Sequence, residues 1–323
     1  MGSLANYVIR RVLFAIPVFL AVSIITFLIT NAAGDPVNIV KLGIRNITPA
    51  QLAQLRAFFH VNEPIYIRYF YWLSDFLHGY LGQSLYTGSV NSLIIPWIGT
   101  TLELQIPALL LALGIGVPIG IYSAKHQYSK GDYAITTSAI FGISMPTFWI
   151  GIMAIIVFSY YLHWLPAFGA YSTYPPYWWG NPTFDALAHV ILPLSVLTLV
   201  SIATITRLTR VNMLETLRQD FILAGRASGL SEFKVTYKHA LKNAITPVVT
   251  IVGLSFGTLL AGAPALETTF SWPGLGFAFV TAASRLDLPT VQGIIMIITV
   301  MVLIANIATD LAYAFMDPRV RIT

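Results

Sequence analysis

The segment Asp220-Phe-Ile-Leu-Ala-Gly-Arg-Ala-Ser-Gly-Leu230, which continues to Asn243, is a basic, helix-compatible break between two apolar runs. A polar segment of this length between two membrane spans faces water, and its Lys and Arg residues place that water in the cytoplasm. Seven basic residues lie between Arg207 and Asn243. The sequence therefore predicts an inner loop over residues 207–243, with membrane-spanning segments on both sides of it.

The composition of the chain agrees with this interpretation. Of 323 residues, 56% are hydrophobic and 10% are charged, and the mean hydropathy is +0.74, whereas soluble domains carry about 25% charged residues. The basic residues flank apolar runs, which is typical of membrane orientation, so no nucleic-acid partner is expected. The chain has no cysteine, which excludes disulfides, thiolate metal sites and Cys nucleophiles.

Six apolar runs are long enough to cross a bilayer as helices, and they cover residues 12–30, 101–122, 133–162, 188–206, 244–266 and 291–315. With this map, thirteen of the eighteen Lys and Arg residues lie on the cytoplasmic side. They include Arg10 and Arg11 before the first run and Arg319 and Arg321 after the last. We predict an all-α polytopic protein of the cell membrane, with six transmembrane helices and both termini in the cytoplasm.

This map divides the chain into three regions. Residues 1–30 form the N-terminus and first span, residues 31–99 an extracytoplasmic helical insertion, and residues 100–323 a five-helix core that contains the inner loop. In the insertion, Thr48-Pro49 is a typical helix start, and an amphipathic aromatic helix is expected from Pro64. In the core, Pro146 predicts a kink or tilt of the third span.

Two ionisable residues near span ends have alternative interpretations. Glu103 is a functional candidate as an acid inside a membrane, but Thr100-Thr-Leu-Glu103 also has the spacing of a capping box at a helix start, which we favour. His189 is a candidate proton or substrate site, and a simple hydrogen-bonded histidine is the preferred interpretation.

Several sequence motifs of catalysis are missing. The chain has no G-x-x-x-x-G-K-[ST] phosphate loop and no H-E-x-x-H zinc motif. We therefore expect no nucleotide hydrolysis, no catalytic residue, and no cofactor or metal site in this chain.

The inner loop carries the positive signal. The segment contains four apolar residues, Phe221, Ile222, Leu223 and Leu230, among its charged ones, and exposed apolar groups need a cover. Gly229 can end one short helix in a left-handed conformation, and Ser231 can begin the next. A helix–glycine–helix elbow would fit a groove on a partner protein, although an amphipathic helix pair resting on lipid headgroups remains equally open from the residues alone.

The whole chain also resembles a known family. The matching segments are Tyr7-Val-Ile-Arg-Arg11, Gly34-Asp-Pro36, Gly79-Tyr-Leu-Gly-Gln-Ser84, Thr101-Leu-Glu-Leu104, the inner loop from Asp220 to Asn243, Glu267-Thr-Thr-Phe-Ser-Trp-Pro-Gly-Leu-Gly276 and Asp317-Pro-Arg319. Together they resemble a permease subunit of an ATP-binding-cassette (ABC) importer, in the dipeptide/oligopeptide/nickel branch and of the first-permease type.

The resemblance implies the type I ABC importer permease fold, and it makes residues 100–323 the permease core. It also implies three kinds of protein partner besides the lipid bilayer: a second homologous permease, two ABC ATPase subunits and an extracytoplasmic solute-binding protein. ATP and Mg²⁺ would be bound by the ATPases. The ATPase-coupling residues implied are Asp220, Phe221, Leu223, Ala224, Gly225, Arg226, Ala227, Gly229 and Leu230.

The chain departs from the family pattern in two places. Leu223-Ala224-Gly225 stands where the wider superfamily has Glu-Ala-Ala, so a glutamate contact to the ATPase is not expected. Tyr80 stands where the usual Gly-Asp-Leu-Gly segment has Asp.

Three alternatives remain for function. The resemblance predicts import of peptides, but the same machinery also imports oligosaccharides or nickel complexes in this branch. An ion-coupled secondary transporter would need inverted repeats or broken helices that bind ions, and no repeat is evident. A membrane-embedded enzyme or an assembly scaffold is disfavoured by the missing motifs.

Overall fold

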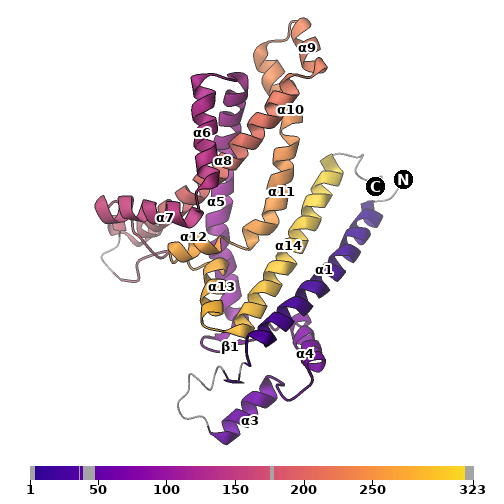
Figure 1. Cartoon of the computed structure of the whole chain (residues 1–323), viewed down its shortest axis with the longest axis vertical. Coiled ribbons are helices and arrows are strands. Elements are labelled where there is room, and N and C mark those ends of the chain that lie inside the picture. Colours follow the sequence, from indigo (N-terminus) through magenta and orange to yellow (C-terminus); the bar gives the residue numbers. More distant parts are fainter. Residues whose placement is uncertain (1–3, 36, 39–47, 175–177, 317–323) are drawn as a thin grey trace. The chain divides into compact units, whose positions relative to one another are not determined.

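The computed structural model describes residues 4–35, 37–38, 48–174 and 178–316 of the chain (Figure 1). Within these ranges the protein is helical, apart from a hairpin of two short antiparallel strands, β1 (Gln83–Ser84) and β2 (Gly88–Ser89). Contacts between residues divide the chain into two compact units. The first contains residues 1–100, 256–264 and 274–323, and the second contains residues 101–255 and 265–273.

Four helices are long and apolar enough to cross a membrane: α1 (Leu4–Ala33), α5 (Val90–Lys125), α8 (Pro182–Leu217) and α14 (Leu288–Met316). A fifth candidate is a broken span. It consists of α6 (Lys130–Ser144), followed after a bend of 100° by α7 (Thr147–Ala154) and the π-helix η1 (Ile155–Tyr161). The bend lies at Pro146, because proline lacks the N–H that would continue the helix. The expected kink is therefore confirmed.

The expected fifth span, residues 244–266, is shorter than predicted. Helix α11 (Thr246–Leu260) has 15 residues, whereas a spanning helix needs about 20. Among the described residues, the structure thus supports a multi-span helical membrane protein with four or five long candidate spans. Residues 317–323, which include the predicted cytoplasmic Arg319 and Arg321, lie outside the described part.

Two predicted helix boundaries are wrong. The second span was expected to begin near Thr101, but α5 begins at Val90. Thr100 therefore lies inside a helix, where its hydroxyl donates to the carbonyl oxygen of Pro96 at 3.1 Å, and the capping-box interpretation of Thr100 and Glu103 fails. Residues 207–217 were expected in the inner loop, but they belong to α8, which ends at Leu217.

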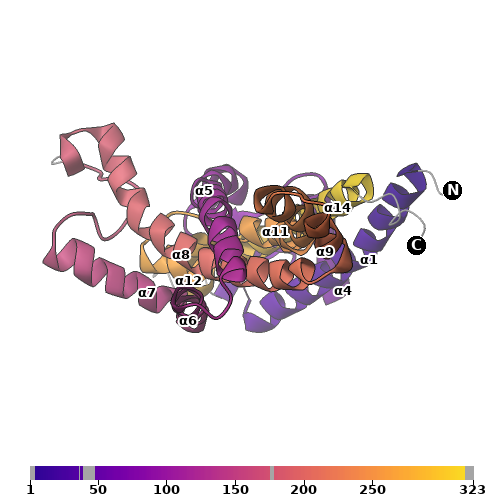
Figure 2. The same cartoon turned by 90° about the horizontal axis from the view of Figure 1, so that it is seen from above.

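The first unit packs α1 against α14, which lie side by side in both views (Figures 1 and 2). Its outer elements are α3 (Pro49–Phe58), α4 (Ile65–Leu77) and α13 (Leu275–Ser284). The predicted start of α3 is confirmed, because Thr48 and Gln51 form a capping box with Pro49 at the first helical position. The core of this unit consists of Leu81, Val90, Ile94, Leu275, Ala278 and Ile294.

A buried carboxylate fixes the hairpin in the first unit. Asp287, 4% exposed, lies just before α14. It accepts hydrogen bonds from the Ser84 hydroxyl at 2.6 Å and from the Leu85 main-chain N–H at 3.0 Å. The turn of the hairpin is thereby tied to a residue about two hundred positions later in the chain.

The second unit packs α6 and α8 together, and the C-terminal half of α5 against α8. Glycines allow a close approach of α5 to α8. The Thr206 hydroxyl donates to the carbonyl oxygen of Gly116 at 3.2 Å, and a Cβ atom built on Gly120 would lie 2.6 Å from Cβ of Thr209. This spacing of small residues is typical of helix packing in membranes.

Glu103 and His189, the two ionisable residues with alternative interpretations near span ends, can now be placed. His189 is 5% exposed, and its Nδ1 lies 2.8 Å from the carbonyl oxygen of Asp185, one turn earlier in α8. The hydrogen-bonded interpretation is confirmed. Glu103 is exposed on α5 in this single chain.

One sequence pattern resembles a catalytic motif without its geometry. Residues 253–257 read Gly-Leu-Ser-Phe-Gly and match the G-x-S-x-G pattern of hydrolase nucleophiles. All five lie within α11, whereas that motif needs a sharp turn between a strand and a helix. The second glycine serves packing instead, because a Cβ atom on Gly257 would lie 3.2 Å from the Val302 side chain of α14.

Candidate functional site

The predicted inner segment forms an elbow of two helical arms, which we define as residues 220–244. The first arm is α9 (Asp220–Ala227), and the second contains the π-helix η3 (Lys234–Ala240) and α10 (Leu241–Ala244). Figure 1 shows α9 beyond α10, at one end of the second unit. The elbow thus has the helix–glycine–helix form that the sequence predicts.

Gly229 makes the turn between the arms. Its φ angle is +79°, a left-handed conformation that glycine adopts without steric cost. The N–H of Gly229 donates to the Arg226 carbonyl at 3.0 Å, and the N–H of Leu230 donates to the Gly225 carbonyl at 3.2 Å. These two bonds form a Schellman motif, which satisfies the carbonyl groups left free at the end of α9.

Gly225 has a different role in the same turn. A Cβ atom built on it would lie 3.4 Å from Cδ1 of Leu230, so the Leu230 side chain folds back over α9. Such an apolar contact across the cap is common in this motif. It fixes the position at which the second arm leaves the turn.

An ion pair connects the two arms across the turn. The Arg226 Nε atom donates to Oε1 of Glu232 at 2.8 Å, and Nη2 donates to Oε2 at 3.3 Å. Both side chains are exposed, 40% and 59% respectively, so the pair adds little to stability. Its two-point geometry restrains the angle between the arms. Glu232 is not among the residues predicted from the sequence. Its opposite charge, six residues after Arg226, is a signal from which the pair could have been predicted.

The elbow is anchored by an internal core. Ile222 is 1% exposed and Val235 is 1% exposed, so each arm contributes one buried anchor. The core they join also contains Ile121, Ala124, Met213, Ala240 and Ala244, from α5, α8 and the second arm. The expectation that Ile222 needs an external cover is wrong, because the fold itself covers it. A displacement of the elbow is therefore transmitted to α5 and α8 through this shared core.

Other apolar side chains of the elbow are exposed. Phe221 and Leu223 of α9 are 43% and 53% exposed, and Phe233 beyond the turn is 70% exposed. Phe233 contacts Tyr237 with ring centroids 4.7 Å apart. The predicted residues Asp220, Ala224, Ala227, Gly229 and Leu230 are exposed on the same elbow. An exposed apolar face of this kind marks an interaction surface.

A buried ion pair supports the elbow from below. Arg210 of α8 donates to both carboxylate oxygens of Asp132 of α6, at 2.6 and 2.8 Å. Asp132 also accepts from the Ser123 hydroxyl and from the Tyr128 main-chain N–H. This pair joins α6 to α8 at the end of the unit that carries the elbow. From the sequence, Arg210 is one of the basic residues that indicate orientation, and no pattern there points to Asp132.

No group of three or more His, Cys, Asp or Glu residues in the described part is arranged to hold a metal ion. The ion pair of the elbow is Arg226 with Glu232, and both side chains are exposed. The geometry of the elbow suits contact with another protein rather than bond-making chemistry.

Comparison with known proteins identifies relatives over nearly the whole length. A model of the family described as binding-protein-dependent transport system inner membrane component matches residues 116–322. A model of the N-terminal part of such membrane components matches residues 4–101. The elbow lies inside the first of these matches.

Individual relatives are similar over both full chains. The oligopeptide transport system permease protein AppB of Bacillus subtilis is 38% identical over 320 residues, which cover 98% of this chain and 99% of that protein. The dipeptide transport system permease protein DppB of Escherichia coli K12 is 37% identical over 335 residues, with 98% of each chain covered. The di/tripeptide transport system permease protein DppB of Pseudomonas aeruginosa is 37% identical, also with 98% of each chain covered.

Proposed function

The chain belongs to the family of inner membrane components of binding-protein-dependent transport systems, and on this premise we propose that it is the transmembrane permease subunit of an ATP-driven importer of short peptides. It is a multi-pass protein of the cell membrane and a non-catalytic subunit. It forms half of the pathway through which peptides delivered by a solute-binding protein cross the membrane.

The elbow is the observation that supports coupling to an ATPase. Its side chains Phe221, Leu223 and Phe233 are exposed, whereas Ile222 and Val235 are buried and anchor it. A partner that moves the exposed side therefore moves α5 and α8, because the buried side is packed against them. We assign the coupling role to the residues predicted for it from Asp220 to Leu230.

The mechanism follows from linkage. ATP closes a dimer of two ABC ATPase subunits, which bind Mg²⁺ and ATP. The closed and open ATPase dimers must prefer different permease shapes, since only a difference in affinity can shift the equilibrium between inward-facing and outward-facing states. The assembly then contains this chain, a second homologous permease, the two ATPases and the solute-binding protein.

We infer six membrane spans with both termini in the cytoplasm. In this arrangement the fifth span is α11, extended by its neighbouring residues, and the broken α6–α7 segment is the third span. The concentration of Lys and Arg around the elbow supports a cytoplasmic location. The type I ABC importer permease fold is proposed from the family to which the chain belongs.

Peptides are the substrate that the relatives favour. Their names specify oligopeptides, dipeptides and di/tripeptides, and none of these three specifies an oligosaccharide or nickel. No observation favours an ion-coupled secondary transporter, which would not need an exposed apolar elbow.

The test is transport by the reconstituted complex. Proteoliposomes that contain this chain, its second permease and its ATPases should accumulate a labelled tripeptide when ATP and the solute-binding protein are present. Uptake that continues without ATP, but stops when ion gradients are dissipated, would refute the proposal. Labelled oligosaccharide and a nickel complex serve as competing substrates.

A further inference from the structure

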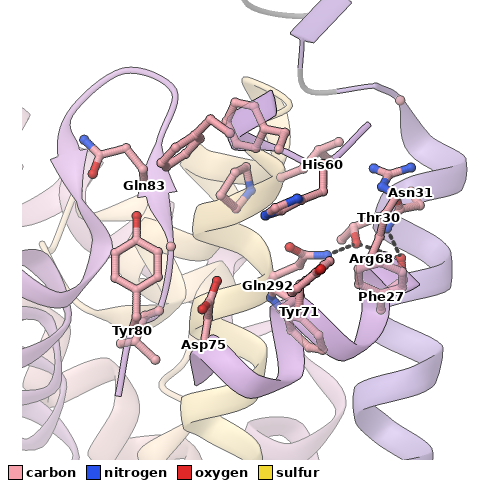
Figure 3. A pocket seen from close by; sticks show the side chains of 18 residues that line it. Phe27, Thr30, Asn31, His60, Arg68, Tyr71, Asp75, Tyr80, Gln83 and Gln292 are labelled. Carbon is pink, nitrogen blue, oxygen red and sulfur yellow. Dashed lines mark hydrogen bonds between the residues drawn. The ribbon is translucent and has the colours of Figure 1, made fainter. Parts of the chain in front are cut away.

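The first unit contains a cavity of about 320 Å³ (Figure 3). Its walls come from the C-terminal end of α1, the segment after α3, the helix α4 and the start of α14. Cavities that hold small ligands begin at about 300 Å³. The cavity is therefore large enough for a small polar molecule, and the elbow lies in the other unit.

One end of the cavity is positively charged. The Arg68 guanidinium lies beside Asn31 of α1 (Figure 3). Its Nε atom is buried and has no hydrogen-bond partner among the residues that the structure describes. A buried guanidinium N–H without an acceptor is unfavourable, and the planar donor fork of arginine matches a carboxylate.

A carboxylate lies at the other end. Asp75 lies in Figure 3 between Tyr80 and Gln292, and within the described ranges no ion pair neutralises it. Burial and, after it, the negative charge of Asp75 raise the pKa of the Tyr80 phenol. The phenol thus stays protonated and polar, and Asp75 supplies the negative charge.

The spacing of Arg68 and Asp75 along α4 indicates the length of a matching ligand. Arg68 and Asp75 are seven residues apart on α4, and thus on one face of the helix. Their Cα atoms are separated by about 10 Å along the axis, at about 1.5 Å per residue. An extended chain of about three residues covers the same distance, at roughly 3.3–3.6 Å per residue.

The middle of the cavity is suited to a peptide. The Gln292 amide and the His60 imidazole face the space between the charges (Figure 3). Because Nε2 of Gln292 donates to the Thr30 hydroxyl, its Oε1 is the atom that can accept from a peptide N–H, and the His60 ring can also hydrogen-bond to peptide groups. His60 is stacked on Tyr71 with ring centroids 4.4 Å apart. Phe27 adds an aromatic wall for side chains.

We propose that this cavity binds a short peptide of two to three residues by its two charged ends, with the terminal carboxylate at Arg68 and the terminal ammonium at Asp75. The inference rests on the proposed function for the identity of the substrate. It adds a peptide site that belongs to the permease itself and lies apart from the solute-binding protein.

The experiment measures binding of trialanine to the complete transporter in nanodiscs, without ATP and without the solute-binding protein. Trialanine with free ends is compared with its N-acetylated and its C-amidated forms. The wild type should bind each blocked form about tenfold more weakly, because each loses one charged contact. Arg68→Gln should weaken binding of free trialanine and remove the effect of amidation alone. Asp75→Asn should remove the effect of acetylation alone.

The matched controls are Arg56→Gln and Glu63→Gln, which change exposed charges outside the cavity and should leave all three affinities unchanged. Thermal unfolding confirms that each variant is folded. Wild-type discrimination in Arg68→Gln or Asp75→Asn would overturn the proposal, as would equal affinities for free and blocked peptides. So would loss of solute-binding-protein docking in both variants while peptide binding is unchanged, because it would identify the cavity as a docking surface.

Uptake by the wild-type transporter separates this inference from the proposed function. If uptake of the tripeptide depends on ATP but free and blocked trialanine bind equally well, the cavity site alone is refuted. If free trialanine binds more tightly than the blocked forms but uptake does not depend on ATP, the proposed function alone is refuted.

Discussion

At the scale of single residues, Gly229 determines the geometry of the elbow through its backbone. No atom lies within 4 Å of the position of a Cβ atom there, so a side chain has room. The obstacle is the φ angle of +79°, which costs an ordinary residue roughly 1–2 kcal/mol. The turn therefore constrains conformation and leaves volume free.

We predict that Gly229→Val lowers substrate-stimulated ATPase activity several-fold, while the complex still assembles. Valine is β-branched and resists the left-handed conformation, whereas asparagine adopts it more readily. Gly229→Asn is therefore the matched control and should retain most of the coupling. Equal activity of the valine variant and the wild type would contradict the role of the turn.

Arg226 offers a second test at this scale, because its guanidinium pairs with Glu232 inside the elbow. We predict that Arg226→Gln and Glu232→Gln reduce coupling by a similar factor, and that the double variant is no worse than either one. Thermal stability should change by less than about 1 kcal/mol, since the pair is exposed. The measurement is a double-mutant cycle on substrate-stimulated ATPase activity.

A different pattern would reassign Arg226. If Arg226→Gln reduces coupling and Glu232→Gln does not, the guanidinium contacts the ATPase directly. The intramolecular clasp would then have no part in coupling.

At the scale of elements, the contact of α5 with α8 depends on glycine. A Cβ atom on Gly120 would lie 2.6 Å from Cβ of Thr209 and 2.8 Å from the main-chain oxygen of Thr206. The second of these is a backbone atom and cannot rotate away. The two helices also support the core of the elbow, so their packing and coupling are connected.

We predict that Gly120→Ala destabilises the folded permease by about 1–3 kcal/mol, because the extra methyl group overpacks the contact. Gly114→Ala is the matched control on the same helix. No atom lies within 4 Å of the position of its Cβ atom, and alanine favours a helix over glycine. Thermal unfolding in detergent measures both variants, and equal midpoints would show that α5 and α8 tolerate the methyl group.

Element boundaries were the least predictable feature. Apolar length and Pro146 predicted the existence of the spans and the position of the break, and Thr48-Pro49 predicted the start of α3. The predicted start of α5 and the predicted end of α8 each differ from the structure by about ten residues. The Thr100 hydroxyl finds its hydrogen-bond acceptor inside the helix, and the Arg210 guanidinium finds its partner in a tertiary ion pair. Sequence patterns contain no information on such partners.

At the scale of the whole molecule, the proposed six-span topology makes a prediction about sidedness. The chain contains no cysteine, so single cysteines can be introduced without a background. Gln127→Cys and Ser228→Cys should react with a membrane-impermeant maleimide only after the membrane is opened. Asn62→Cys and Thr173→Cys should react in intact cells.

All four positions are polar residues between or after helices, and Asn62, Thr173 and Ser228 are exposed. The wild-type chain, which has no cysteine, is the control and should remain unlabelled. Labelling of Ser228→Cys in intact cells would place the elbow outside and refute coupling to a cytoplasmic ATPase.

The sequence by itself determined the membrane class, the broken third span, the glycine turn of the elbow and the family. These follow from local properties: apolar length, the missing N–H of proline, the freedom of glycine at positive φ, and motif identity. Only the tertiary structure decided which apolar residues of the elbow are buried, since Ile222 and Phe221 are neighbours in sequence, yet the first is buried and the second is exposed. It also joined Asp132 to Arg210 and Arg68 to a cavity, because such contacts depend on how distant helices pack and not on the order of residues along the chain.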